Sequence, residues 1–133
     1  MKVYFATSIR GSGSDLDLAR GVIHHLKERG HEVINGDIYS SDSPDENADD
    51  TFVFERDIGM LDKADVLIAD VTYPSLGVGY EICEALRRGK RVIAFYKRGT
   101  RVSKLILGNP DVELVEFSSS RELLNALLSV LEG

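Results

Sequence analysis

The sequence lacks several features by which classes of protein are recognised. Its 133 residues include one cysteine, which allows no internal disulfide and no cysteine-rich metal site. The apolar runs fall far short of the roughly 20 residues that span a bilayer, and no apolar signal segment precedes the first strand-like run. Basic residues number 16 against 22 acidic ones, and the net charge of −6 disfavours a nucleic-acid polymer, which needs a basic face. We therefore expect a cytoplasmic protein that binds neither a membrane nor a nucleic-acid polymer.

What is present is a regular alternation of strand-like and helix-like segments. Hydrophobic residues make up 43% of the chain, which excludes a disordered protein, and the length suits a single domain over residues 1–133. The predicted strands are residues 3–7, 32–34, 65–70, 91–96 and 112–117, and the predicted helices are residues 14–30, 51–63, 77–88, 102–107 and 120–131. Residues 40–50 are predicted to be an exposed loop. This alternation indicates an α/β fold, with a doubly wound, flavodoxin-like sheet of five parallel strands in the order 2-1-3-4-5.

One carboxylate lies among apolar residues of a predicted helix. Asp57 has Val53, Phe54, Met60 and Leu61 three and four positions away, so all five share one helix face. We expect Asp57 near the middle of the stripe that faces the sheet, where loss of water raises the pKa of a carboxyl group. The alternative is that Asp57 caps or hydrogen-bonds a neighbouring loop.

A second carboxylate lies at the border of an apolar stripe. Glu81 follows Val78 by three positions and precedes Ala85 by four, about one turn into a helix that starts after a buried strand. That places it at the rim of the crevice where this fold binds ligands. The alternative is a partly solvated glutamate that pairs with a cation such as Arg88.

Two carboxylates at this edge of the sheet suggest the chemistry of glycosidic bonds. One carboxylate attacks or stabilises an oxocarbenium-like centre, and the other handles the proton of the leaving group. Because Asp57 is expected in the more apolar setting, it would be the acid and Glu81 the nucleophile.

Two glycine-containing loops flank these groups. Residues 7–14 follow the first strand and open a helix, where backbone N–H groups can hold an anion. They match neither a Walker A loop nor a dinucleotide fingerprint, and a glycine-rich surface turn explains them as well. In the second loop, residues 75–81, Gly77 and Gly79 allow close approach of the backbone to a ligand.

Four segments together resemble a known family. Residues 3–11 (VYFATSIRG), 55–57 (ERD), 64–66 (ADV) and 74–81 (PSLGVGYE) are similar, in order and over nearly the whole chain, to the nucleoside 2-deoxyribosyltransferase family. The similarity is greatest to its 2'-deoxynucleoside 5'-phosphate N-hydrolase branch. The resemblance implies cleavage of the N-glycosidic bond of a (2'-deoxy)nucleoside 5'-monophosphate, without metal or cofactor, to free base and (deoxy)ribose 5-phosphate.

The same resemblance implies roles for individual residues. Glu81 matches the glutamate that attacks C1' and carries the glycosyl intermediate, and Asp57 matches the aspartate that places it and protonates the base. Tyr4 matches a tyrosine that orients the nucleophile. The residues that match substrate and phosphate contacts are Ser8, Ile9, Arg10, Gly11, Ser75, Gly77, Gly79 and Ser103. Ser103 would reach the site from a neighbouring subunit, which implies a homodimer with shared active sites.

Two departures from the family pattern leave the substrate open. Thr7 replaces a glycine that is common before the serine, and Phe54 stands where animal enzymes have a histidine. The base, and the choice between deoxyribose and ribose, therefore stay undetermined. The alternative functions are a nucleoside 2-deoxyribosyltransferase that exchanges bases and a non-catalytic nucleotide-binding module.

Overall fold

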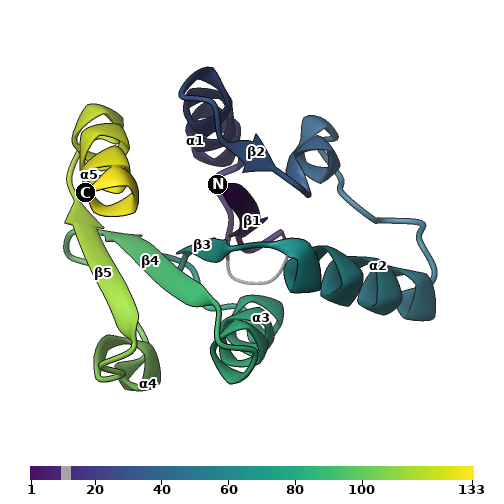
Figure 1. Ribbon diagram of the computed structural model, residues 1–133. Helices are drawn as coiled ribbons and strands as arrows, with labels where there is room; N and C mark the ends of the chain where they lie inside the picture. The colour runs from purple at the N-terminus through teal and green to yellow at the C-terminus, as the bar shows by residue number, and fades with distance from the viewer. Residues whose placement is uncertain (10–12) are drawn as a thin grey trace.

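The computed structural model describes residues 1–9 and 13–133. Its five strands form one parallel sheet in the order β2-β1-β3-β4-β5, which confirms the predicted topology (Figure 1). The strands are β1 (Lys2–Ala6), β2 (Glu32–Val33), β3 (Val66–Asp70), β4 (Arg91–Lys97) and β5 (Val112–Phe117). In a parallel sheet of this order, successive strands are added in one direction from β1 to β2 and in the other direction from β3 onward. Ligands bind at the carboxyl ends of the strands at this switch point between β1 and β3.

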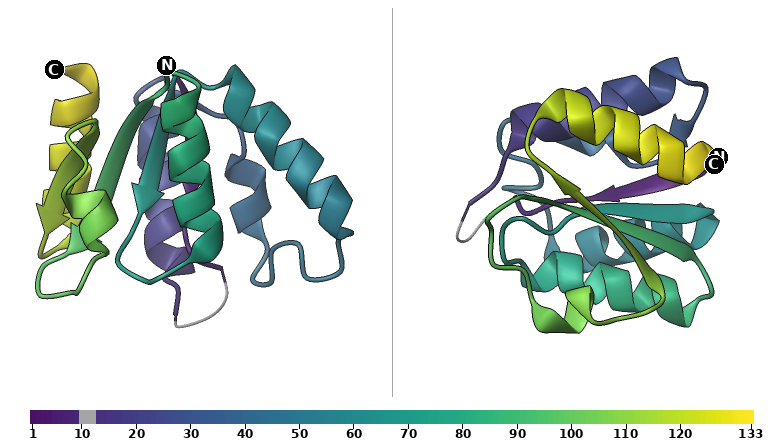
Figure 2. Two further views of the ribbon diagram at one scale, coloured as in Figure 1. Left: turned by 90° about the horizontal axis from the view of Figure 1, so that it is seen from below. Right: turned by 90° about the vertical axis from the view of Figure 1, so that its left-hand side faces the viewer.

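Helices cover both faces of the sheet. They are α1 (Leu16–Glu28), the 3-10 helix η1 (Gly36–Ser40), α2 (Asp50–Lys63), α3 (Leu76–Arg87), α4 (Lys104–Leu107) and α5 (Ser120–Glu132). Helices α1 and α5 lie on one face, and α2, α3 and α4 lie on the other (Figures 1 and 2). No helix within the described ranges is both long and apolar enough to cross a membrane.

Local sequence explains where the helices begin and end. The side chains of Asp15, Ser75 and Ser119 accept hydrogen bonds from backbone N–H groups in the first turns of α1, α3 and α5. Gly30 and Gly89 follow the ends of α1 and α3 with φ of 86° and 73°, a conformation that glycine adopts without steric penalty. The predicted helices are therefore confirmed to within one or two residues at most ends.

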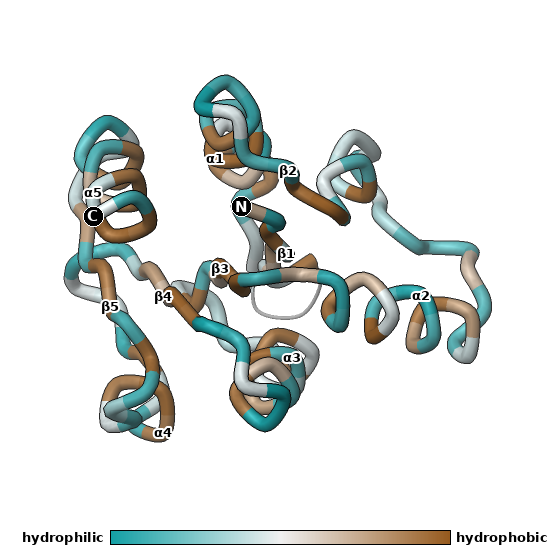
Figure 3. The backbone as a smooth tube through the Cα atoms, in the orientation of Figure 1, coloured by the Kyte–Doolittle hydropathy of each residue, from teal (hydrophilic) through white to brown (hydrophobic). Residues whose placement is uncertain are grey.

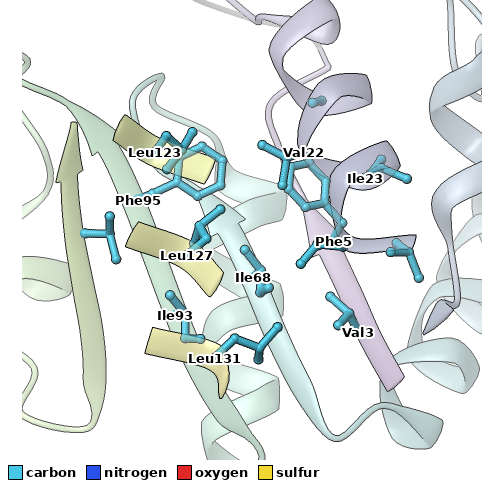
Figure 4. Close-up of a cluster of buried hydrophobic side chains, with 14 of the residues drawn as sticks. Val3, Phe5, Val22, Ile23, Ile68, Ile93, Phe95, Leu123, Leu127 and Leu131 are labelled. Carbon is cyan, nitrogen blue, oxygen red and sulfur yellow. The ribbon is translucent and has the colours of Figure 1, made fainter. Parts of the chain in front are cut away.

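The sheet separates two hydrophobic cores. One core lies under α1 and α5 and includes Phe5, Ile68 and Phe95 (Figure 4). The other lies under α2, α3 and α4 and includes Tyr4 and Ile82. Figure 3 shows the hydrophobic parts of α1 and α5 turned toward the sheet. Because side chains alternate along a strand, β1 contributes to both cores.

Helix α2 differs from its prediction. Leu61 is its only fully buried residue, and Phe54, which we expected in the stripe that faces the sheet, is 54% exposed. The amino-terminal part of α2 projects beyond the sheet (Figure 1). Asp57 therefore does not lie in the middle of a fully covered apolar stripe.

Candidate active site

Tyr4 and Glu81 meet beneath helix α3. Tyr4 lies on β1, is 1% exposed and projects toward the core under α3. Glu81 lies in the second turn of α3, which starts at the carboxyl end of β3. The Tyr4 hydroxyl donates a hydrogen bond to Glu81 Oε2. The structure thus brings together two of the residues that the sequence singles out, from segments 77 positions apart.

Burial controls the ionisation of this pair. It raises the pKa of Glu81 to about 7, although the hydrogen bond from Tyr4 favours the charged form, and the nearby charge of Asp57 adds to the rise. Burial and the Glu81 charge raise the pKa of Tyr4 well above its usual range. Tyr4 is therefore a permanent hydrogen-bond donor, and Glu81 changes charge near neutral pH.

Asp57 has a charged partner. Arg56 Nε donates to Asp57 Oδ1 at 3.0 Å, and the Asp57 side chain is 25% exposed. Burial raises the pKa of Asp57, the contact with Arg56 opposes this rise, and the charge of Asp45 adds to it. The expectation that Asp57 has the more apolar setting is wrong, since Asp57 contacts a guanidinium group whereas Glu81 contacts a neutral hydroxyl.

The loop after β1 is only partly within the described residues. Ser8 is buried, and Ile9 packs against the core under α1. Arg10 and Gly11, which the resemblance assigns to the sugar-phosphate end of the substrate, lie outside the described residues. A Cβ atom on Gly13 would come within 2.7 Å of the ring of Tyr73, so the loop after β1 rests closely on the loop after β3.

The loop that begins α3 leaves its backbone accessible. Ser75 Oγ accepts from the Val78 N–H at 3.2 Å and caps the helix. A Cβ on Gly77 would meet only Ser75 Oγ, at 3.9 Å, and a Cβ on Gly79 would meet no atom within 4 Å. Open space beside this turn suits the close approach of a ligand.

Ser103 lies apart from these residues. Its Oγ accepts from the Leu105 N–H at 3.3 Å and caps the short helix α4, which packs along β5. Strands β5 and β1 are separated in the sheet by β3 and β4, and α4 lies beyond α3 from α2 (Figure 1). A single chain therefore does not bring Ser103 to the Tyr4–Glu81 pair.

Several polar residues near the site escaped the sequence analysis. The Asn35 side chain accepts from the Phe5 N–H at 2.8 Å and donates to the Phe5 carbonyl at 2.6 Å, which pairs the backbone of β1 beyond the short strand β2. Tyr39 donates to the same carbonyl at 3.1 Å. Asp45 pairs with Arg56. Only the ERD segment pointed to this region, because loop contacts leave no periodic pattern in a sequence.

Two further observations concern possible metal ligands and a cavity. In the described part of the chain, no group of three or more potential metal ligands lies together. A cavity of about 510 Å³ lies on the other side of the sheet, where Asp15, Asp70 and Lys97 contribute to its lining. Tyr4, Asp57 and Glu81 do not line that cavity.

Comparison with known proteins finds relatives along nearly the whole chain. The family model for nucleoside 2-deoxyribosyltransferase matches residues 3–124. A Thermofilum pendens protein provisionally named 2'-deoxynucleoside 5'-phosphate N-hydrolase 1 is 41% identical over 144 aligned positions, covering 100% of this chain and 96% of its own. The 5-hydroxymethyl-dUMP N-hydrolase of Danio rerio is 31% identical over 126 residues, covering 92% and 88%. The solved structure of a Clostridium botulinum CMP N-glycosidase shares the fold, with a TM-score of 0.70 at 21% identity over 96% of this chain and 98% of that chain.

Proposed function

The chain belongs to the nucleoside 2-deoxyribosyltransferase family, and we propose that it is an N-glycosidase of (2'-deoxy)nucleoside 5'-monophosphates. Its products are the free base and (deoxy)ribose 5-phosphate. The observation that carries this function is the Tyr4–Glu81 contact, in which a buried hydroxyl orients a carboxylate of α3, with Asp57 close enough to affect its charge. The N-hydrolase names of relatives at 31% and 41% identity support the same reaction.

The first step forms a bond between Glu81 and the sugar. The ionised carboxylate attacks C1', the bond from C1' to the base nitrogen breaks, and its electrons leave with the base. Asp57 gives its proton to the departing base. Tyr4 holds Oε2 of Glu81, and the other oxygen of the carboxylate attacks.

The second step restores the enzyme. Water attacks C1' of the glycosyl ester, the bond from C1' to Glu81 breaks, and Glu81 leaves as a carboxylate. Asp57, now ionised, takes the proton of the water. Two carboxylates complete this cycle, and no metal or cofactor takes part.

Hydroxyl and backbone groups hold the phosphate despite the net charge of the chain. The N-terminus of α3 offers backbone N–H groups and the Ser75 hydroxyl at an open turn. A single phosphate needs only local donors, unlike a polymer, which needs an extended basic face. The proposed contacts are Ser8, Ile9, Arg10, Gly11, Ser75, Gly77, Gly79 and, from a second copy of the chain, Ser103.

A second copy completes the site because Ser103 lies too far round the sheet to serve its own chain. The outer surface of α3 and α4 supports a dimer. Leu76 and Leu105 are 96% and 88% exposed, and Tyr80 and Cys83 continue the apolar side of α3. Phe54 packs edge-on against Tyr80 at 6.5 Å and extends this surface to α2. Residues 1–133 then form a single domain, and two copies of the chain form a homodimer with two shared active sites.

Release of free base tests the reaction. The protein is incubated with each common deoxynucleoside and nucleoside 5'-monophosphate and with the matching unphosphorylated nucleosides, and free base is separated by chromatography. We expect base only from monophosphates. An added acceptor base that becomes a new nucleoside would identify a transferase. Tight binding in calorimetry with every ligand unchanged would identify a non-catalytic module and overturn the proposed reaction.

Complementation tests the shared site. Ser103→Asp keeps a good helix cap but places a negative charge against the phosphate. We expect Ser103→Asp and Glu81→Gln each to be nearly inactive alone. Mixed and allowed to exchange subunits, they should regain up to about a quarter of wild-type activity, since half of the protomers are in mixed dimers with one intact site each. A mixture that stays inactive while light scattering shows mixed dimers would refute the shared site.

A further inference from the structure

Arg56 joins two carboxylates from different segments. Its Nη1 and Nη2 donate to Asp45 Oδ1 and Oδ2 at 2.9 and 2.6 Å, and its Nε donates to Asp57 Oδ1 at 3.0 Å. Asp45 belongs to the loop between η1 and α2, whereas Arg56 and Asp57 lie on α2. One guanidinium group therefore connects the loop to the candidate acid.

The geometry of this connection is specific to arginine. The planar guanidinium group presents a fork of two donors to one carboxylate and keeps a third donor, Nε–H, for another. The Arg56 and Asp45 side chains are 19% and 17% exposed, so water screens the pair less than it screens a surface ion pair. Phe52 lies 5.5 Å from the guanidinium carbon and limits its movement on the other side.

The loop holds Asp45 in an unusual conformation. Asp45 has φ of 61° and is the only non-glycine residue with positive φ in the described part of the chain. That conformation is unfavourable for most residues with a Cβ, and aspartate is among the few that tolerate it. Pro44 beside it is buried, while residues 41–43, 46 and 47 are exposed. The loop therefore contacts the rest of the molecule at Pro44 and at Asp45, the residue with the positive φ.

Charged and titratable groups from several elements surround Asp57. Arg56 lies beside it on α2, and Asp45 faces it from the loop. Glu81 on α3, Tyr4 on β1 and Tyr39 on η1 are each affected by its charge. Burial raises the pKa of both tyrosines, so they stay neutral, and the balance at Asp57 depends on Arg56, Asp45 and Glu81.

We propose that Arg56 and Asp45 are positioning residues for Asp57. Asp45 engages both terminal nitrogens of Arg56, and the guanidinium group meets Asp57 at Oδ1, where Nε donates and Nη2 also lies at 3.0 Å. This contact fixes the place of the Asp57 carboxyl group, while Asp45 shares the positive charge of Arg56 and so weakens its hold on the ionised form of Asp57. The assignment rests on the proposed function insofar as Asp57 must carry a proton to the leaving base.

Removing Asp45 and removing Arg56 should change the pKa of Asp57 in opposite directions. In Asp45→Asn a neighbouring negative charge disappears and the guanidinium fork is released toward Asp57, so the pKa of Asp57 falls. In Arg56→Gln the positive charge disappears while Asp45 remains, so the pKa of Asp57 rises. A general loss of local structure would move both variants in the same direction, toward the ordinary value for an aspartate.

NMR titration of the Asp57 carboxyl carbon tests this without reference to catalysis. The protein is labelled with ¹³C at aspartate, and the Asp57 signal is identified by its absence in Asp57→Asn. We expect a downward pKa shift of about half to one unit in Asp45→Asn and an upward shift of similar size in Arg56→Gln. Asp62→Asn and Arg88→Gln, which break an exposed ion pair between α2 and α3, should leave the titration unchanged.

Shifts in the same direction, or none, would overturn the assignment. If Arg56→Gln does not fold, Asp45→Asn is compared with Asp62→Asn by two readings. A downward shift with the other aspartate signals unchanged agrees with the assignment, whereas a downward shift with those signals displaced shows loss of local structure and overturns it. Kinetics form a second readout. We expect kcat to fall about tenfold in both variants with KM changed less than threefold, because neither residue contacts substrate. If no monophosphate is hydrolysed by wild type, the proposed function fails while the NMR result still decides how Asp57 is held.

Discussion

Tyr4 and Phe5 are neighbours on β1 and are almost equally buried, yet their side chains lie on opposite faces of the sheet. Phe5 has an apolar side chain and packs within the core under α1 and α5, with its ring centroid 5.7 Å from that of Tyr39 and 6.1 Å from that of Phe95. Tyr4 has a similar ring, but its hydroxyl donates to Glu81. One strand thus serves an apolar core on one side and an ionisable pair on the other.

The difference separates stability from chemistry. On the α1 and α5 side, the core that contains Phe5 consists of hydrophobic side chains, and burial of apolar surface stabilises the fold. On the α3 side, a carboxyl group is held where its charged form is poorly solvated, which costs free energy at neutral pH. Substitutions on the two faces should therefore change different measured quantities.

Glu81→Gln should have the largest effect and should act on the α3 face alone. The amide cannot attack C1', so kcat should fall by roughly 10⁴-fold or more while the fold is retained. Glu84→Gln is the matched control, because Glu84 lies on the same helix and pairs with Arg87 and Arg88 at the surface. Free-base release from the preferred monophosphate is the measurement. Retention of more than about a tenth of the activity would exclude Glu81 as the nucleophile.

Phe5→Ala should act on the other face. It leaves a cavity among Val22, Tyr39 and Phe95 and should lower the free energy of unfolding by about 3–5 kcal/mol. Activity per folded molecule should change little in comparison with Glu81→Gln. Urea unfolding is the measurement. Phe52→Ala, at a position 55% exposed, should lower the free energy of unfolding by less than about 1 kcal/mol. Equal losses in the two variants would contradict the assignment of Phe5 to the main core.

Tyr4→Phe removes the hydroxyl that donates to Glu81 and leaves an apolar ring, like that of Phe5, on the α3 face of the sheet. A hydrogen bond to a charged group contributes about 1.5–3 kcal/mol, so kcat should fall roughly 10- to 100-fold. The pKa of Glu81 should rise further, because the Tyr4 hydroxyl favours its ionised form. Tyr96→Phe, on β4 and against the same core, is the control and should keep full activity. Unchanged activity in Tyr4→Phe would mean that Glu81 needs no orienting donor.

Much of the fold was predictable from the sequence, because its signals are local. Short apolar runs such as residues 66–70 and caps such as Ser75 and Gly89 determine where strands and helices lie, and the parallel order follows from their alternation. Helix α2 was the exception. Its apolar residues have helical spacing, but only Leu61 is fully buried and the amino-terminal part projects beyond the sheet (Figure 1). How far a sheet extends beneath a helix cannot be read from the sequence of that helix.

The candidate site was predictable in its residue types and less so in its electrostatics. Asp57 and Glu81 stand out because carboxylates interrupt apolar stripes. Their relative settings depend on Arg56, whose side chain turns toward Asp57, and on Tyr4, which lies far away in sequence. Side-chain direction and pairing over long sequence separation have no period, so sequence reasoning assigned the more apolar setting to the wrong carboxylate.

The last expected effect concerns the pH dependence of the free energy of unfolding and compares wild type with Glu81→Gln. Glu81 has a pKa of about 7 in the folded protein against 4.5 ordinarily, so the unfolded chain loses this proton first as pH rises. Stability of the wild type should therefore decline between these values relative to the variant. Near pH 4 the two should differ little, and near pH 8 the variant should be more stable by about 3 kcal/mol in urea unfolding. A gap that stays constant or narrows as pH rises would show that burial does not raise the Glu81 pKa, and the two faces would then differ in chemistry without differing in cost.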